Sequence, residues 1–475
     1  MPRLPVYWLT AGLLAAAMTS QTLNQQWSGD AQAHAAAITE LVLRPGSPDE
    51  PFVGGVDPSP YLSPWSLSWG LVATVTGWDS YTTLVAAALV NLVLLLVAFR
   101  VFVGHVGFDD RGAAIALVCV VALWGLSPWR WSGFINLNSL GFGLAYPSIT
   151  AYALMLLTWT LVLRYLRRER SPALVAASVL MAIIALSHPF TALITGLGVV
   201  ALLVAAAPRR RQVLAVGFSM LAAGALALLW PWYSLIDAAL AGDAYQAIHR
   251  TFYEPAALVR LALLLVAVPV LVGRWRSNRR DLFVWFTILG LATYLVGWLA
   301  DVSSLGRVIP LLVLGPQLAV AAWLSTRGRP DVVHDRSSWF VVAGWVAIAA
   351  GVLACLPGLT RAVPAALLPD SAEEALRFRD HPGSRELERQ VPAGDTVLVT
   401  DQDVARGLVA VGRRVVSTPY IQPLIPDAAE RSTTSATFTS LSPADRREAI
   451  DRYGIDWVAR LAPDGEWTAS RPTIR

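Results

Sequence analysis

The most informative part of the sequence is the apolar run Leu84-Val-Ala-Ala-Ala-Leu-Val-Asn-Leu-Val-Leu-Leu-Leu-Val-Ala-Phe99. It belongs to a segment, residues 82–104, that is long enough to cross the roughly 30 Å hydrocarbon core of a bilayer as a helix. Similar segments recur along the chain, and 55% of its 475 residues are hydrophobic while only 15% are charged. Soluble domains have a different composition. The sequence therefore predicts a mainly α protein, a polytopic bundle of transmembrane helices.

About eleven segments are long enough to span a membrane. They cover residues 4–22, 82–104, 112–127, 148–166, 172–187, 190–207, 212–230, 256–273, 281–299, 308–325 and 338–356. Arginines mark every second connection between these segments, as at 164–170, 209–211 and 274–280. Because basic loops stay in the cytoplasm, the alternation predicts a multi-pass plasma-membrane protein with a cytoplasmic N-terminus and an external C-terminus.

The chain becomes charged and rich in turns after Leu368. We therefore predict a transmembrane domain over residues 1–368 and a small, soluble, extracytoplasmic α/β domain over residues 369–475. Within the second domain, short apolar patterns predict strands, and Ser442-Pro-Ala-Asp445 has the composition of a helix start. The expected strands lie at 395–400, 412–416 and 455–459, and the expected helix runs from 442 to 454.

The first external loop, about residues 23–81, is the longest one predicted. We expect its apolar segment, residues 61–77, to form a helix at the membrane interface. Ser28 is expected to cap an earlier helix, with Asp30 in the first turn and His34, four residues on, on the same face. Asp30 there either complements the helix dipole or accepts a proton from an attacking hydroxyl.

This layout resembles the C-type superfamily of integral-membrane glycosyltransferases. The resemblance rests on an acid just after the first span, a long first loop, a histidine at an external helix end, and an external C-terminal domain like those of bacterial members. The segments that carry it are Trp27-Ser-Gly-Asp30, Tyr61-Leu-Ser-Pro-Trp-Ser-Leu67, Ser187-His-Pro189, Val391-Pro-Ala-Gly-Asp-Thr-Val-Leu-Val399 and Tyr453-Gly-Ile-Asp-Trp457.

The resemblance implies an enzyme of the bacterial plasma membrane. Such an enzyme transfers a sugar, with inversion, from a polyprenyl-phosphate donor to a cell-envelope glycan, lipid or protein acceptor on the external face. Its partners are these substrates and membrane lipids, without nucleic acid, and a divalent cation, Mg²⁺ or Mn²⁺, is a further expectation. The residue that matches the catalytic base of the superfamily is Asp30.

A second acid is common in the superfamily, but no acid stands next to Asp30 in this sequence. Asp57, in a turn bounded by prolines in the same loop, is the first candidate for a second catalytic acid, although an ordinary turn also favours Asp there. Asp49, Glu50 and Asp237 are the alternatives.

A lipid-phosphate donor requires a fixed cation at headgroup depth. Arg307 stands in a predicted external loop, against the general charge trend, and its planar fork suits phosphate oxygens. Pairing with Asp301 or with a lipid phosphate is the alternative. We also predict substrate binding for His188, before the helix-starting Pro189, and for His34, although both also suit the membrane interface.

Two other functions are compatible with a polytopic bundle. A transporter or flippase of lipid-linked precursors would need polar residues along a path through the bilayer, and broken-helix repeats. Neither is evident in the sequence. A non-catalytic envelope-assembly protein is the other alternative, and it would tolerate replacement of Asp30.

Overall fold

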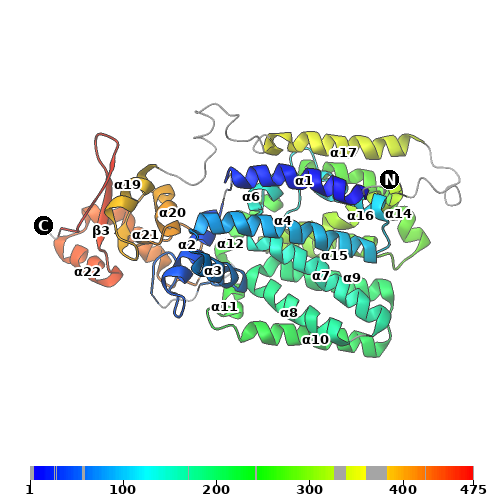
Figure 1. The fold of residues 1–475 in the computed structure, drawn as a ribbon, viewed down its shortest axis with the longest axis horizontal. Coiled ribbons are helices and arrows are strands. Elements are labelled where there is room, and N and C mark those ends of the chain that lie inside the picture. Colours follow the sequence, from blue (N-terminus) through cyan, green and yellow to red (C-terminus); the bar gives the residue numbers. More distant parts are fainter. Residues whose placement is uncertain are drawn as a thin grey trace. The chain divides into compact units, whose positions relative to one another are not determined.

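A computed structural model describes residues 5–25, 27, 29–55, 59–169, 171–240, 243–325, 338–359, 382–422 and 424–473 (Figure 1). The chain divides into two compact units. The first contains Met1–Gln26, Ala88–Leu229 and Tyr245–Pro369, and the second contains Trp27–Ala87, Trp230–Ala244 and Asp370–Arg475. The predicted first external loop therefore belongs to the same unit as the C-terminal residues.

The first unit is a helix bundle whose long helices run roughly parallel to one another (Figure 1). Its α-helices are α1 (Val6–Leu23), α4 (Ser80–His105, which begins in the second unit), α5 (Asp110–Ala122), α6 (Leu137–Gly143), α7 (Pro147–Arg168), α8 (Ser171–Ser187), α9 (Pro189–Ala206), α10 (Arg210–Leu228), α12 (Asp243–His249, which also begins in the second unit), α13 (Ala256–Leu261), α14 (Val268–Ser277), α15 (Leu282–Leu299), α16 (Ile309–Ser325) and α17 (Ser338–Leu359). Three 3₁₀ segments join them: η1 (Arg250–Phe252), η2 (Ala262–Ala267) and η3 (Ser303–Val308).

Every predicted span coincides with one of these helices or with a helix continued by a 3₁₀ segment. Among the described residues, seven helical segments are long and apolar enough to cross a membrane. Large apolar side chains such as Leu13, Val93 and Phe218 are exposed on the bundle, as lipid-facing residues are. The prediction of a mainly α membrane protein is confirmed.

Glycines allow two helices of the bundle to pack with their backbones in contact. A Cβ atom added at Gly290 of α15 would overlap the backbone of Leu312 in α16. A Cβ atom added at Gly315 of α16 would overlap the carbonyl oxygen of Phe283 and the side chain of Thr287 in α15. Small residues give the same close approach in membrane helix pairs generally.

The second unit contains α-helices and a small sheet. Its helices are α2 (Ala31–Leu43), α3 (Pro64–Thr76), α11 (Leu235–Leu240), α19 (Pro382–Gln390), α20 (Gln402–Ala410), α21 (Ala428–Thr437), the 3₁₀ turn η7 (Phe438–Ser440) and α22 (Pro443–Tyr453). The strands are β1 (Thr396–Leu398), β2 (Arg414–Val415), β3 (Trp457–Leu461) and β4 (Trp467–Ser470), in the order β2-β1-β3-β4. β1 is parallel to both β2 and β3, and β4 is antiparallel to β3.

The α/β prediction for the C-terminal residues is confirmed, including the helix start at Ser442. The Ser442 hydroxyl accepts a hydrogen bond from the Asp445 N–H at 3.2 Å, and Gly454 ends α22 in a left-handed conformation. Strand β4 was not predicted, because it is short and alternates between half-buried and exposed residues at the edge of the sheet.

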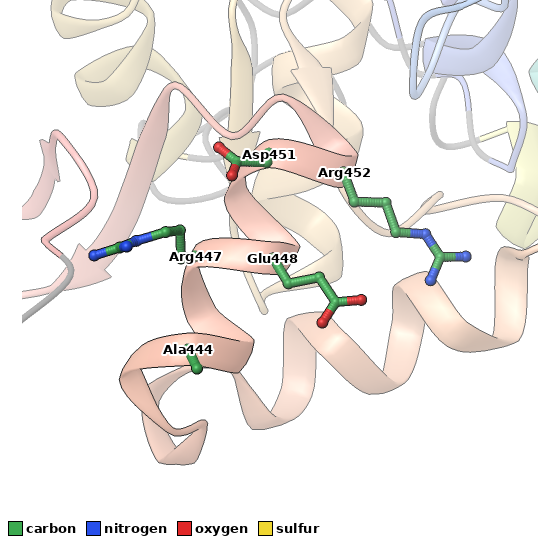
Figure 2. A pocket seen from close by; sticks show the side chains of 5 residues that line it. All are labelled: Ala444, Arg447, Glu448, Asp451 and Arg452. Atoms are coloured by element: carbon green, nitrogen blue, oxygen red, sulfur yellow. The ribbon is translucent and has the colours of Figure 1, made fainter.

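The exposed face of α22 borders a hollow of about 600 Å³ (Figure 2). Its lining carries charges of both signs: Ala444, Arg447, Glu448, Asp451 and Arg452. Arg452 is paired with Glu430 of α21. A lining of mixed sign on a surface helix does not present a phosphate with a uniform positive field, so we do not place the function there.

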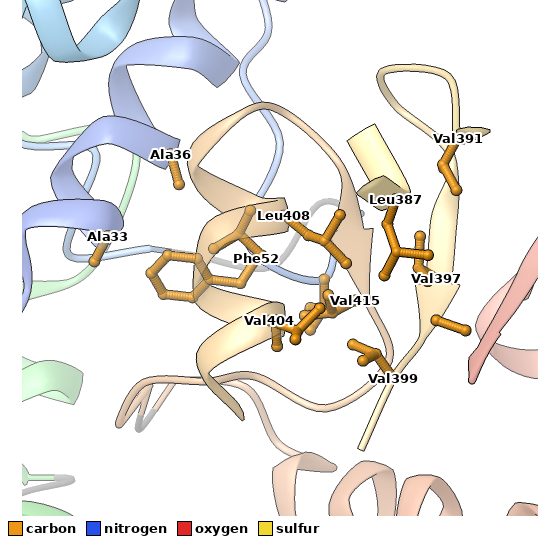
Figure 3. Close-up of a cluster of buried hydrophobic side chains, with 14 of the residues drawn as sticks. Ala33, Ala36, Phe52, Leu387, Val391, Val397, Val399, Val404, Leu408 and Val415 are labelled. Atoms are coloured by element: carbon orange, nitrogen blue, oxygen red, sulfur yellow. The ribbon is translucent and has the colours of Figure 1, made fainter. Parts of the chain in front are cut away.

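The core of the second unit contains side chains from both ends of the sequence (Figure 3). Phe52 of the first loop is fully buried beside Val404 and Leu408 of α20. Its backbone carbonyl oxygen accepts a hydrogen bond from the Val415 N–H, at 2.8 Å, on strand β2. The predicted domain boundary after residue 368 stays a prediction. In the structure, residues 27–87 belong to the same compact unit as residues 370–475.

Candidate active site

Asp30 lies at the N-cap position of α2, one residue before the helix begins at Ala31. This differs from the expectation that Ser28 caps the helix and Asp30 sits in its first turn; Ser28 lies outside the described residues. Gly29 takes a positive φ of 72°, which a glycine adopts readily and which turns the chain into the helix. The Asp30 carbonyl oxygen accepts from the His34 N–H at 3.0 Å, while the carboxylate makes no capping bond. An exposed carboxylate therefore stands at the positive end of α2.

His34 lies inside the second unit. Its side chain is only 8% exposed. The ring centroid is 5.6 Å from that of Tyr61 and 5.4 Å from that of Trp65, so the imidazole lies between α2 and α3. Burial lowers the pKa of His34 from 6.5 to about 3, and the ring is neutral at physiological pH. Substrate binding by His34 stays a prediction, and its burial favours a packing role.

The candidates for the second catalytic acid differ in their surroundings. Asp57, the first candidate, lies outside the described residues. Asp49 forms ion pairs with Arg44 and with Arg414 of β2, which ties the loop to the sheet. Asp237 is exposed on α11. The contacts of Asp49 are structural, so of these acids Asp57 stays the first to test.

Glu50 is fully buried in the second unit. One carboxylate oxygen accepts hydrogen bonds from the backbone N–H groups of Phe52 and Val53, at 2.7 and 2.8 Å. The other accepts from the side-chain amide of Gln422 at 3.3 Å. A buried carboxylate requires such donors, and Glu50 uses them to hold the tight turn that places Phe52 in the core.

Arg307 lies within η3 of the first unit and is 4% exposed. One of its terminal nitrogens lies 3.2 Å from the Ser132 hydroxyl and 3.1 Å from Nε2 of His188. The guanidinium carbon is 5.2 Å from the Trp131 ring centroid and 4.9 Å from that of Phe190. These distances suit cation–π contacts. The predicted phosphate ligand is thus a buried cation held in an aromatic cage.

His188 is the N-cap residue of α9 and contacts Arg307 directly. Nε2 of the His188 ring faces the guanidinium, and Nδ1 accepts a hydrogen bond from the Thr191 N–H at 3.3 Å and lies 2.7 Å from the Thr191 hydroxyl oxygen. A Cβ atom at Gly133 would lie only 3.2 Å from the ring. The structure therefore brings two predicted substrate-binding residues together, with His188 fixed against Arg307.

His249 belongs to the same cage and was missed by sequence reasoning. It is 2% exposed, and its ring stacks on Phe252 at 5.7 Å and meets Phe190 edge-on at 5.2 Å. Burial, and then the charge of Arg307, lower the pKa of His249 to about 3. Its Nδ1 has no hydrogen-bond partner among the residues that the structure describes. Nothing in the spacing of the sequence links His249 to Arg307.

A metal site is not formed by the described part of the chain. There, no three side chains of His, Cys, Asp or Glu gather closely enough to hold an ion. Asp30 and the acids around it do not supply a ligand set by themselves, so we derive no step through the expected Mg²⁺ or Mn²⁺.

Comparison with known proteins shows similarity of structure without similarity of sequence. No family model and no curated protein sequence match the chain. The crystal structure of the Archaeoglobus fulgidus oligosaccharyltransferase tethered with an acceptor peptide containing the NVT sequon matches it with a TM-score of 0.50 and 11% identity. The complex of the same archaeon's oligosaccharyltransferase AglB with an inhibitory peptide and a dolichol-phosphate has a TM-score of 0.51 and 11% identity. Each match covers 98% of this chain and 74% of the other.

A third structure, the Archaeoglobus fulgidus oligosaccharyltransferase in complex with Zn and sulfate, has a TM-score of 0.52 and 12% identity. It covers 94% of this chain and 67% of the other. The chain thus has the fold of these oligosaccharyltransferase structures, and the resemblance seen in its sequence is confirmed at the level of the fold.

Proposed function

We propose that this protein is a membrane glycosyltransferase that moves a sugar from a polyprenyl-phosphate-linked donor to an acceptor on the external face of the membrane, with inversion. The observation that carries the proposal is Asp30, an exposed carboxylate that follows the first apolar helix, α1, and stands at the start of α2 in a chain with this fold. The dolichol-phosphate and the acceptor peptide in the similar structures support the classes of donor and acceptor.

The proposed chemistry needs one base. An acceptor hydroxyl oxygen attacks the anomeric carbon on the face opposite the phosphate, and the Asp30 carboxylate takes the hydroxyl proton as the new C–O bond forms. The bond between the anomeric carbon and the phosphate oxygen breaks, and its electron pair leaves with the lipid phosphate. The configuration at the anomeric carbon inverts because the two bonds lie on opposite faces.

Arg307 is the proposed ligand of the donor phosphate. Its planar fork matches phosphate oxygens, and Ser132 and His188 hold the fork in one orientation. The apolar rings around the guanidinium exclude water, which strengthens its attraction for an anion. In this proposal His188 orients Arg307 and does not itself bind the sugar.

The proposal is tested by mass spectrometry of envelope glycolipids from a deletion strain. We expect a polyprenyl-phosphate sugar to accumulate, to disappear when the wild-type protein is restored, and to persist with the Asp30→Asn protein. Asp451→Asn, which changes an exposed carboxylate on α22, is the matched control and should restore the wild-type pattern. Unchanged glycolipids in the deletion strain would contradict the proposal.

The same strain separates a transferase from a flippase of the lipid-linked precursor. A missing transferase leaves the donor on the outer leaflet, where an impermeant oxidant such as periodate destroys its sugar in intact cells. A missing flippase leaves the donor on the inner leaflet, where the sugar is protected. Protection would favour the flippase.

A further inference from the structure

Tyr420, from the C-terminal part of the chain, lies at the start of α2. Its hydroxyl donates a hydrogen bond to Oε1 of Gln32 in the first turn, at 3.2 Å. The ring packs against Phe52, with centroids 5.3 Å apart, and the Arg406 guanidinium carbon lies 5.6 Å from the ring centroid. Burial, and then the negative charge of Asp30, raise the pKa of Tyr420. The phenol is therefore a protonated group close to the proposed base.

The first turn of α2 needs partners from outside the helix. The first N–H groups of any helix have no partner within it, and the side chain at the N-cap position, Asp30, makes no capping bond here. A hydrogen bond with the Ala33 backbone partly offsets the rise in the pKa of the Tyr420 hydroxyl. A phenol oxygen can donate and accept at once, so Tyr420 can serve as an external cap.

The rest of α2 is held by the same part of the chain. The Thr39 hydroxyl donates to the Ala410 carbonyl oxygen, at the end of α20, with a distance of 2.9 Å. A Cβ atom at Gly412 would contact the Thr39 side chain, and Ala33 and Ala36 of α2 belong to the shared core. α2 is thus packed along its length on the described residues between 382 and 473, which we call the C-terminal module, and the Tyr420 hydroxyl lies at the end of α2 that carries Asp30.

We infer that Tyr420 is a positioning residue for Asp30: its hydroxyl fixes the first turn of α2, and the C-terminal module thereby holds the proposed base in place. This inference rests on the proposed function for the catalytic meaning of Asp30. The hold of Tyr420 on α2 can be measured without any transfer reaction.

The test compares the full-length wild-type protein with Tyr420→Phe, which keeps the ring and removes only the hydroxyl. Hydrogen exchange followed by mass spectrometry should show amides in the first turn of α2 exchanging about fivefold faster in Tyr420→Phe, as expected for loss of a helix cap. Tyr453→Phe is the matched control, because the Tyr453 hydroxyl is buried without a hydrogen-bond partner among the described residues. Exchange in α2 should be unchanged in that variant.

Turnover is then measured with lipids extracted from the deletion strain as the donor. We expect Tyr420→Phe to lower kcat about threefold or more while KM for the donor stays at the wild-type value, and Tyr453→Phe to change neither. Unchanged exchange in Tyr420→Phe, or faster exchange with unchanged kcat, would overturn the inference. Failure of the proposed function has a different signature, since the wild-type protein would then transfer no sugar.

Discussion

Arg307 is oriented by a hydroxyl, an imidazole and aromatic rings, and a lysine cannot reproduce these contacts. We expect Arg307→Lys to bind undecaprenyl phosphate at least about tenfold more weakly, which is about 1.4 kcal/mol. The measurement is a titration of the purified protein with that lipid. Arg279→Lys changes an exposed arginine between α14 and α15 and serves as the control. Equal affinity of both variants for undecaprenyl phosphate would show that Arg307 only packs against its neighbours and does not bind the phosphate.

His34 makes the stability of the protein sensitive to acid. Its pKa is 6.5 in an unfolded chain and about 3 in the folded protein, so between these values the unfolded chain binds more protons. The contribution of His34 to the free energy of unfolding is therefore fully present above pH 6.5. It falls as the pH is lowered, by about 2 kcal/mol between pH 7 and pH 5. We expect His34→Phe to show a smaller drop in thermal midpoint over this range. An equal drop in both proteins would mean that His34 does not stay neutral.

The positions of single residues were predicted best where their signal is local. Asp30 was placed near a helix start because it follows an apolar segment, and His188 was placed at a helix start because Pro189 follows it. Their roles stay predictions. The contact between His188 and Arg307 joins residues 119 positions apart, and no periodicity links them. The burial of Glu50 and the presence of His249 in the cage also depend on distant segments, so the sequence could not reveal them.

The contact between α15 and α16 requires glycine. Gly290→Ala should destabilise the protein by about 1–3 kcal/mol, because the added methyl group meets the Leu312 backbone, which cannot move aside easily. Gly217→Ala, on α10, adds the same atom where nothing lies within 4 Å, and should be neutral or slightly stabilising. Thermal midpoints of the purified variants in detergent measure the difference. Equal midpoints would show that the helices separate readily.

Individual helices and strands were predictable because their signals lie within a few residues. The apolar segments became helices, and Ser442 caps α22 as predicted. The start of α2 was placed wrongly, since Asp30, and not a residue before it, occupies the N-cap position. Strand β4 was not predicted, because its composition is not typical of a strand and only its pairing with β3 identifies it.

Orientation in the membrane is a property of the whole chain and remains a prediction from the arginine pattern. Two exposed serines, Ser440 and Ser277, suit a labelling test. Replaced singly by cysteine, Ser440 should react with an impermeant thiol reagent in intact cells, and Ser277 only after lysis. The native Cys119 and Cys355 are buried and should give little background. Labelling at Ser277 and protection at Ser440 in intact cells would show that the chain has the opposite orientation.

The grouping of segments into units could not be read from the sequence. A change of composition marked residue 369, yet the core around Phe52 joins the first loop to α20 and β2. That arrangement depends on packing between segments more than 300 residues apart, as in the bond from Thr39 to Ala410, with a separation of 371. Composition indicates whether a segment lies in water or in lipid, whereas shape and hydrogen bonding decide which other segments it contacts.

The role of Asp30 is the central claim, and turnover of purified Asp30→Asn tests it most directly. Asparagine is as good an N-cap residue as aspartate, so α2 should keep its start, but the amide cannot take the acceptor proton. With lipids of the deletion strain as donor and its envelope as acceptor, we expect turnover to fall about a hundredfold or more. The Asp451→Asn protein should keep wild-type turnover. Transfer by Asp30→Asn at a rate near that of the wild type would contradict the account, and Asp57 would become the residue to test.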